Sequence, residues 1–222
     1  LSKKDADRIF TEKFFMNLPN KLSVLRLLLI PVIMVTFYVN FPYHYVVSCA
    51  LFGFAACTDF LDGHIARKYN LVTDLGKFLD SSADKVLVLT TLILLLDAGF
   101  ITGDVLPSFI GGLCIAVILA REILISCLRM VTAAKGIVMA ADKLGKIKTI
   151  LQDVSIVFFL LAGEFGKSGT IYSAIKDGAL ANILHNVIFF IGLGLFVLAI
   201  IMTVVSGVHY VLVYGSKLED DK

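Results

Sequence analysis

The sequence contains few charged residues for its length. Asp, Glu, Lys and Arg make up 17% of the 222 residues, whereas soluble domains usually carry about a quarter. The formal net charge is only +2, so nothing indicates a nucleic-acid partner. With 58% hydrophobic residues, this scarcity of charge excludes a soluble domain and predicts an all-α, polytopic membrane protein.

Cysteine is also scarce, and the four cysteines all lie in apolar runs. None forms a Cys-x-x-Cys pair, which argues against a zinc site or a redox pair. The first apolar run, from Leu22, is too long for a secretory signal. No internal repeat or low-complexity segment is visible. The four histidines show no ligand spacing, so we assign them no role.

Apolar runs of about 20 residues are long enough to cross a bilayer. Lys and Arg gather before the first run, after the second and fourth, and in the C-terminal tail. This distribution predicts that both termini are cytoplasmic, in agreement with an even number of spans. The six predicted spans are residues 22–40, 44–66, 77–98, 107–130, 147–163 and 183–214, the last being longer than a bilayer requires.

Residues 1–15 allow two interpretations. Their apolar residues keep helical spacing, which is typical of an amphipathic helix at the membrane surface. Alternatively, Met16 is a natural start and residues 1–15 come from a fusion.

Four aspartates mark the cytoplasmic ends of the second and third predicted spans. Asp59 and Asp62 are three residues apart on one helix, and Asp80 and Asp84 are four apart on the next, so each pair shares a helix face. Carboxylates near membrane depth are costly and usually functional. If the two helices are antiparallel neighbours, the four carboxylates converge, and a divalent cation would offset their repulsion. An all-oxygen set favours Mg²⁺, Mn²⁺ or Ca²⁺ over zinc.

The residues around the first aspartate pair suit a nucleotide. Gly63 and Ala66 lie on the same helix face and leave room for it, and Arg67 suits a phosphate. The alternative is a solvated loop in which nearby lysines pair with the aspartates. Such a loop does not require the same-face spacing seen on both predicted helices.

The pattern Asp59-x-x-Asp62-Gly63-x-x-Ala66-Arg67, eight residues, Gly76-x-x-x-Asp80-x-x-x-Asp84 resembles the signature of the CDP-alcohol phosphotransferase family at all eight positions. The resemblance implies a six-helix membrane domain over residues 16–222, usually homodimeric, with one or two Mg²⁺ or Mn²⁺ ions. It implies metal binding by Asp59, Asp62, Asp80 and Asp84, with Asp84 as the general base. It implies CDP binding by Asp59, Asp62, Gly63, Ala66, Arg67, Gly76 and Asp80.

Further segments resemble the bacterial branch of the family that uses glycerol 3-phosphate as acceptor. They are residues 17–26, 66–80, 121–129 and 144–149. One departure is Ser81, where a proline is expected, and this puts the local helix geometry in question. The resemblance implies CDP-diacylglycerol, glycerol 3-phosphate and membrane lipids as partners. It also implies a multi-pass protein of the bacterial cytoplasmic (inner) membrane with its active site on the cytoplasmic side.

Basic residues in and after the fourth predicted span are candidates for binding the acceptor's phosphate. Arginine within a span is costly and usually paired or functional, and Glu122 beside Arg121 is a candidate partner. A positive-inside loop alone would also explain several of these cations. The predicted acceptor-binding residues are Arg121, Arg129, Lys135, Lys146 and Lys148.

The sequence thus predicts metal-dependent transfer of a phosphatidyl group from CDP-diacylglycerol to glycerol 3-phosphate, with release of CMP. The nearest alternative is the same chemistry with inositol phosphate or serine as acceptor. A cation transporter is a more distant alternative, but its carboxylates should lie near mid-membrane, often in paired repeats. A purely structural scaffold has no use for four facing aspartates.

Overall fold

The computed structural model describes residues 18–68, 74–103, 105–134, 143–175 and 177–219. Among these residues, the side chains of 18–19, 59–68, 74–75, 77, 133–134, 143 and 214–219 lie outside the description. Residues 1–15 also lie outside it, so both interpretations of this segment stay open.

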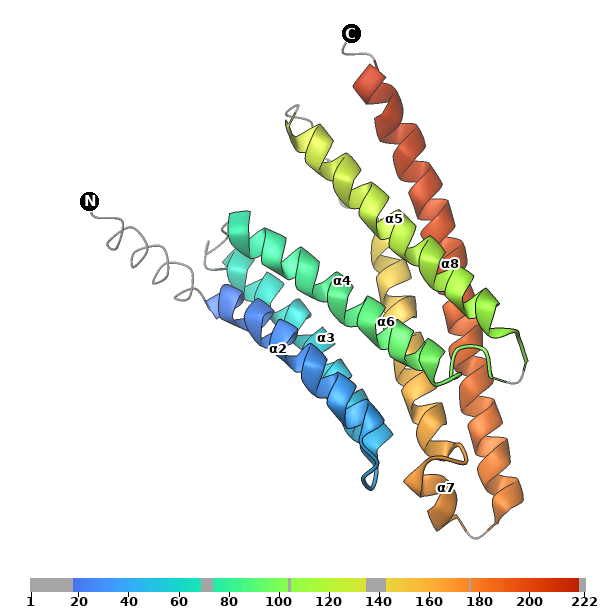
Figure 1. The fold of residues 1–222 in the computed structure, drawn as a ribbon. Helices are drawn as coiled ribbons and strands as arrows, with labels where there is room; N and C mark the ends of the chain where they lie inside the picture. The colour runs from blue at the N-terminus through green and yellow to red at the C-terminus, as the bar shows by residue number, and fades with distance from the viewer. Residues whose placement is uncertain (1–17, 69–73, 104, 135–142, 176, 220–222) are drawn as a thin grey trace. The chain divides into compact units, whose positions relative to one another are not determined.

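The described residues form helices and no strands, as the sequence predicts. Six long helices coincide with the six predicted spans, and a single short helix, α7, lies between the last two (Figure 1). The assignment of residues 16–222 to one domain stays a prediction. The long helices are α2 (Leu18–Tyr38), α3 (His44–Lys68), α4 (Asp74–Asp97), α5 (Ser108–Ala134), α6 (Lys143–Phe165) and α8 (Gly178–Glu219), and α7 is Thr170–Ala174.

Several of these helices have the length and apolar character of membrane spans. Within the described ranges, four segments qualify, and α3 contributes a shorter apolar segment, His44–Thr58. Large apolar side chains such as Leu28, Phe109 and Leu212 are more than 60% exposed, as expected for surfaces that face lipid. The chain is therefore an all-helical membrane protein. The four segments are Asn20–Tyr38, Ser108–Thr132, Leu144–Ala174 and Gly178–Val213.

The sequence explains where several helices begin and how they continue. Pro31 lies inside α2, which tolerates it as membrane helices often do. The Asp177 carboxylate accepts hydrogen bonds from the backbone N–H groups of Ala179 and Leu180 at 3.0 and 3.4 Å, and so caps α8. Helix α4 runs without a break through Ser81, so the absence of a proline after Asp80 does not interrupt it.

The chain divides into two compact units, which meet in sequence at Thr91 and Leu92 within α4. In the first unit α2 packs on α3. Their contact includes the Phe37 and Tyr45 rings, whose centroids are 5.4 Å apart, and a hydrogen bond of 3.0 Å between the Thr36 and Ser48 hydroxyls. These contacts hold the helix that carries Asp59 and Asp62 against α2.

The second unit is built on the pairing of α6 with α8, and α5 also packs on α8. The buried Phe159 ring of α6 contacts Phe189 and Phe196 of α8, with centroids 6.0 and 5.9 Å apart. Gly192 permits the close approach, because a Cβ there would lie 3.0 Å from Cβ of Phe158. Small residues at such contacts are typical of helix packing in membranes.

Candidate active site

The first part of the predicted site lies in the last turns of α3. Asp59, Asp62, Gly63, Ala66 and Arg67 are all in helical conformation there. The helix places Asp59, Asp62 and Ala66 along one face, as the spacing predicts. Their side chains belong to the part of the chain outside the description, so the metal and nucleotide roles of these residues stay predictions.

The second part lies on α4, where Gly76, Asp80 and Asp84 follow one another at intervals of four residues. This spacing puts the three on one face of the helix. The Asp80 side chain is 41% exposed, and Asp84 is half-buried. Asp80 therefore keeps an accessible carboxylate, and Asp84 lies one turn further along the same face.

Arg26 of α2 is a site residue that the motif analysis did not single out. Its side chain is fully buried, its Nε donates to the Ala55 carbonyl of α3 at 3.2 Å, and its Nη1 lies 3.3 Å from Asp80 Oδ1 of α4. One guanidinium therefore joins α2, α3 and α4 beside Asp80. The sequence alone could have indicated Arg26, because a charged residue inside an apolar run is costly unless it is paired.

The chemistry of the residues fits a hard divalent cation. Asp80 and Asp84 offer carboxylate oxygens on one face of α4, and Asp59 and Asp62 share a face of α3. Carboxylate oxygens are the usual protein ligands of Mg²⁺ and Mn²⁺. Among the described side chains no three His, Cys, Asp or Glu residues gather into a ligand group. That search did not include Asp59 and Asp62, so the four-aspartate set stays a prediction.

The second unit contains a charged cluster centred on Glu122, which we call the Glu122 cluster: Arg121, Glu122, Lys148 and Ser206. Glu122 Oε1 of α5 accepts from Arg121 Nη1 at 3.1 Å and forms a close ion pair with Lys148 of α6. Arg121 Nη2 donates to the Ser206 hydroxyl of α8 at 3.0 Å. The predicted pairing of Glu122 with Arg121 is confirmed, and the cluster ties three helices together.

The Glu122 cluster has the character of an anion site. Two cations face one carboxylate, which leaves a net charge of +1. Arg121 Nε is buried and has no hydrogen-bond partner in the described part of the chain. A buried N–H group without a partner is unfavourable, so this guanidinium keeps unused hydrogen-bonding capacity. The guanidinium also lies 6.0 Å from the centroid of the Tyr210 ring.

Four of the five predicted acceptor-binding residues are described, and two of these, Arg121 and Lys148, belong to this cluster. Lys146 is exposed, whereas Lys148 is buried, because residues two apart in a helix point in nearly opposite directions. Arg129 is exposed on α5, about 12 Å along the helix axis from Arg121. Lys135 lies outside the described residues.

Comparison with known proteins defines the class. Residues 16–205 match the family described as CDP-alcohol phosphatidyltransferase. The chain therefore belongs to the CDP-alcohol phosphatidyltransferase family, and it is an enzyme of phospholipid biosynthesis.

The curated relatives of the chain narrow the resemblance further. A CDP-diacylglycerol–glycerol-3-phosphate 3-phosphatidyltransferase of Rickettsia bellii is 43% identical over 148 residues, which cover 67% of this chain and 77% of the relative. A protein with the same name from Bacillus subtilis is 40% identical, and the match covers 65% of this chain and 77% of the relative. One from Salmonella choleraesuis is 38% identical, and the match covers 65% of this chain and 76% of the relative.

The first prediction tests how Arg26 positions Asp80. In Arg26→Lys a single ammonium group replaces the fork that contacts both Ala55 and Asp80. We expect transferase activity to fall about tenfold, the scale of one lost charge-assisted hydrogen bond. The variant should still elute in size-exclusion chromatography at the volume of the folded protein. Lys21→Met, which changes an exposed lysine on the same helix, should keep its activity. Unchanged activity in Arg26→Lys would rule out this positioning role.

The second prediction concerns the stability of the Glu122 cluster. Glu122→Gln leaves two largely buried cations without their carboxylate, and removing one partner of a buried pair typically costs ~3–5 kcal/mol. The melting temperature in detergent should therefore drop by several degrees. Adding Lys148→Met should recover part of the loss, because one unpaired charge is removed. Lys146→Ala, which changes the exposed lysine two residues before Lys148, should leave the melting temperature unchanged. A Glu122→Gln variant as stable as the wild type would contradict the pairing.

Proposed function

We propose that this enzyme transfers the phosphatidyl group of CDP-diacylglycerol to sn-glycerol 3-phosphate, giving phosphatidylglycerophosphate and CMP. The observation that carries the proposal is the similarity to relatives whose names state this donor and this acceptor, at 38–43% identity. The family match over residues 16–205 supports the reaction class. The Glu122 cluster adds physical support for a phosphorylated acceptor, since it carries a net positive charge.

In the proposed reaction Asp84 takes the proton from a hydroxyl of glycerol 3-phosphate. The resulting alkoxide oxygen forms a bond to the β-phosphorus of CDP-diacylglycerol. The bond from that phosphorus to the bridging oxygen breaks, and CMP leaves with the electron pair. The position of Asp84 one turn beyond Asp80 on the same face of α4 supports this role, because a base next to the proposed metal ligands can reach a substrate bound there.

We propose that Asp59, Asp62, Asp80 and Asp84 hold one or two Mg²⁺ or Mn²⁺ ions. When bound, the metal would offset negative charge on the diphosphate and on the departing CMP. Arg26 fixes the Asp80 carboxylate through its contact with Oδ1. Gly63, Ala66, Arg67 and Gly76 are proposed to line the CDP site, where small residues leave room for the nucleotide.

The acceptor's phosphate is assigned to the cations of the second unit. Arg121 and Lys148 are the strongest candidates, because Glu122 and Ser206 fix their side chains before a ligand binds. Arg129, Lys135 and Lys146 remain proposed contributors that would extend the positive surface. Arginine suits this role because its planar fork binds phosphate through two parallel bonds.

The proposed topology has six spans, with both termini and the active site on the cytoplasmic side of a bacterial inner membrane. The distribution of Lys and Arg supports this orientation, and the six long helices match the number of spans. This arrangement lets the acyl chains of CDP-diacylglycerol stay in the bilayer while the soluble acceptor arrives from the cytoplasm. A homodimer is proposed by analogy with the family.

The third prediction tests the acceptor. The full chain, purified in detergent, is given radiolabelled CDP-diacylglycerol with glycerol 3-phosphate, inositol phosphate or serine in parallel reactions. We expect a labelled phospholipid product only with glycerol 3-phosphate. Arg121→Ala should raise KM for glycerol 3-phosphate about ten- to a hundredfold and change KM for the donor little. Turnover with serine or inositol phosphate at an equal or higher rate would assign a different acceptor.

The fourth prediction tests the metal and the base. Excess EDTA should abolish turnover, and Mg²⁺ or Mn²⁺ should restore it. Asp80→Asn should weaken metal-dependent nucleotide binding, whereas Asp84→Asn should largely spare nucleotide binding and lower kcat by about 10²-fold or more, the usual scale for a lost general base. Full activity in EDTA would argue against a metal, and a near wild-type rate in Asp84→Asn would assign the base elsewhere.

A further inference from the structure

A polar cavity lies in the second unit where α6 ends and the first turns of α8 follow. Figure 1 shows these helix ends beside α7. Its volume is about 610 Å³, within the usual range for small-ligand sites. The turn after α4, the turn after α6 and the first turns of α8 line it. Ala162 at this cavity is 14 residues from Lys148 along α6, or about 21 Å. The cavity is therefore separate from the Glu122 cluster.

Two aromatic walls of the cavity depend on glycine. The Phe100 ring packs so closely on Gly163 that a Cβ there would come within 2.4 Å of it. The Phe189 ring covers Gly103 in the same way, because a Cβ added at Gly103 would lie 2.9 Å from the ring. Gly103 also has a positive φ of 51°. No side chain fits at either glycine without displacing a ring, so the walls are closely packed.

The turn that carries Lys167 and Ser168 is held in place by a buried carboxylate. Glu164 is fully buried, and its Oε1 accepts from the backbone N–H groups of Thr170 and Ile171 at 2.7 and 3.2 Å. The Gly169 N–H donates to the Gly166 carbonyl at 2.8 Å. The two polar side chains therefore project from a fixed backbone, which lowers the entropy lost when a ligand binds.

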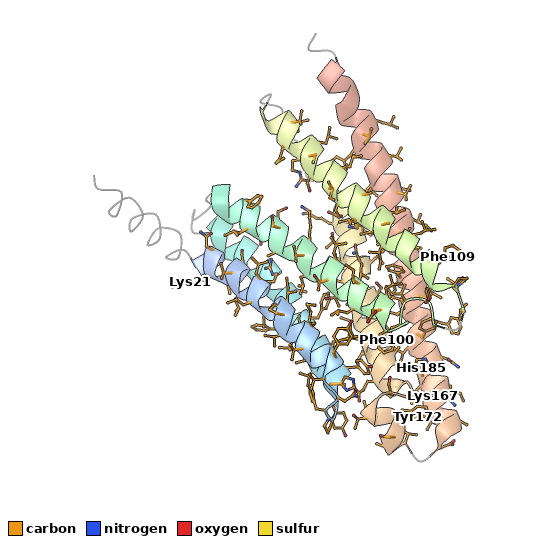
Figure 2. All side chains as sticks on the ribbon, viewed as in Figure 1. Lys21, Phe100, Phe109, Lys167, Tyr172 and His185 are labelled. Atoms are coloured by element: carbon orange, nitrogen blue, oxygen red, sulfur yellow. The ribbon has the colours of Figure 1, made fainter. Side chains whose placement is uncertain are left out.

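The polar groups of the cavity match an anionic ligand that also carries hydroxyl or ester groups. Lys167 supplies a positive charge on the exposed side of the turn, and the Glu164 carboxylate that holds this turn is fully buried and does not line the cavity. His185 Nδ1 lies 2.8 Å from the Ala162 carbonyl, which can only accept, so the other ring nitrogen of the neutral imidazole is an acceptor. Ser168, Asn182 and Asn186 add neutral donors and acceptors. Figure 2 shows Phe100, Lys167 and His185 at this end of the unit.

The surface beside the cavity is suited to acyl chains. On α8, Ile183, Val187 and Phe190 are 58%, 52% and 55% exposed and lie within the apolar segment Gly178–Val213. Asn182 and Asn186 interrupt this apolar character near the start of the helix. Polar and apolar side chains that alternate in the first turns of α8, followed by a continuous apolar stretch, match the boundary between headgroups and hydrocarbon.

We propose that this cavity binds the headgroup of an anionic glycerophospholipid whose acyl chains lie along the exposed apolar surface of α8. The Lys167 ammonium pairs with the phosphodiester, and Ser168, Asn182 and Asn186 donate to its oxygens or to the ester groups. His185 accepts from a headgroup hydroxyl. The site goes beyond the proposed transfer reaction, because neither substrate of that reaction is assigned to this end of the helices.

The test uses the absence of tryptophan from the chain. Ile183→Trp, at an exposed position beside Asn182, gives a single fluorescent reporter near the cavity in the full chain reconstituted in phosphatidylcholine. Quenching by phosphatidylglycerol brominated on its acyl chains, compared with brominated phosphatidylcholine, gives their relative affinities at that position. We expect phosphatidylglycerol to bind about three- to tenfold more tightly, and Lys167→Ala to remove this preference.

Two controls separate the possible ligands and positions. A reporter at Val205, exposed further along α8, should show no effect of Lys167→Ala. Millimolar inorganic phosphate should leave the preference for phosphatidylglycerol at residue 183 unchanged. Loss of this preference in phosphate would show that free phosphate occupies the cavity and would overturn the assignment to a lipid. Equal quenching by the two lipids, or a preference that survives Lys167→Ala, would also overturn the proposal. The readout is lipid binding, so failure of the transferase assay would not affect it.

Discussion

A charge inside an apolar helix bundle must be compensated within the protein, because lipid offers it no solvation. This requirement explains the polar contacts that join helices in each unit. In the first unit the buried Arg26 meets Asp80 and the backbone of α3. In the second, Glu122 lies between Arg121 and Lys148. Each arrangement ties three helices together where the proposed chemistry needs charged groups.

The same compensation prepares the charged groups of each unit for the ligands proposed for them. Each group of charges leaves binding capacity unused: Asp80 remains 41% exposed beside Arg26, and Arg121 Nε is buried without a partner among the described residues. A carboxylate that is held and still accessible suits a metal, and a fixed guanidinium with a donor to spare suits a phosphate. The contacts that stabilise the fold thus also orient the groups proposed to bind ligands.

The helices of the second unit carry different chemistry at their two ends. The end containing Lys148 concentrates charge, whereas the end containing Lys167 combines one cation with amide, hydroxyl and imidazole groups. Between them, the aromatic contacts of Phe159 with Phe189 and Phe196 hold α6 against α8. About 21 Å of α6 separates Lys148 from Ala162 at the cavity, so the two polar regions do not overlap.

The sequence by itself determined the helical membrane class, the six long helices and the same-face spacing of the aspartates. These follow from local properties, namely apolar runs and the period of the α-helix. It also indicated the pairing of Glu122, because that residue is adjacent to Arg121. Only the tertiary structure decided that Arg26 reaches Asp80 across 54 residues of sequence, that Lys148 joins Glu122 while Lys146 does not, and that Phe100, Lys167 and His185 surround one cavity. The physical reason is that such contacts depend on how separate helices pack and rotate against each other, and helical periodicity does not specify this for residues far apart in the chain.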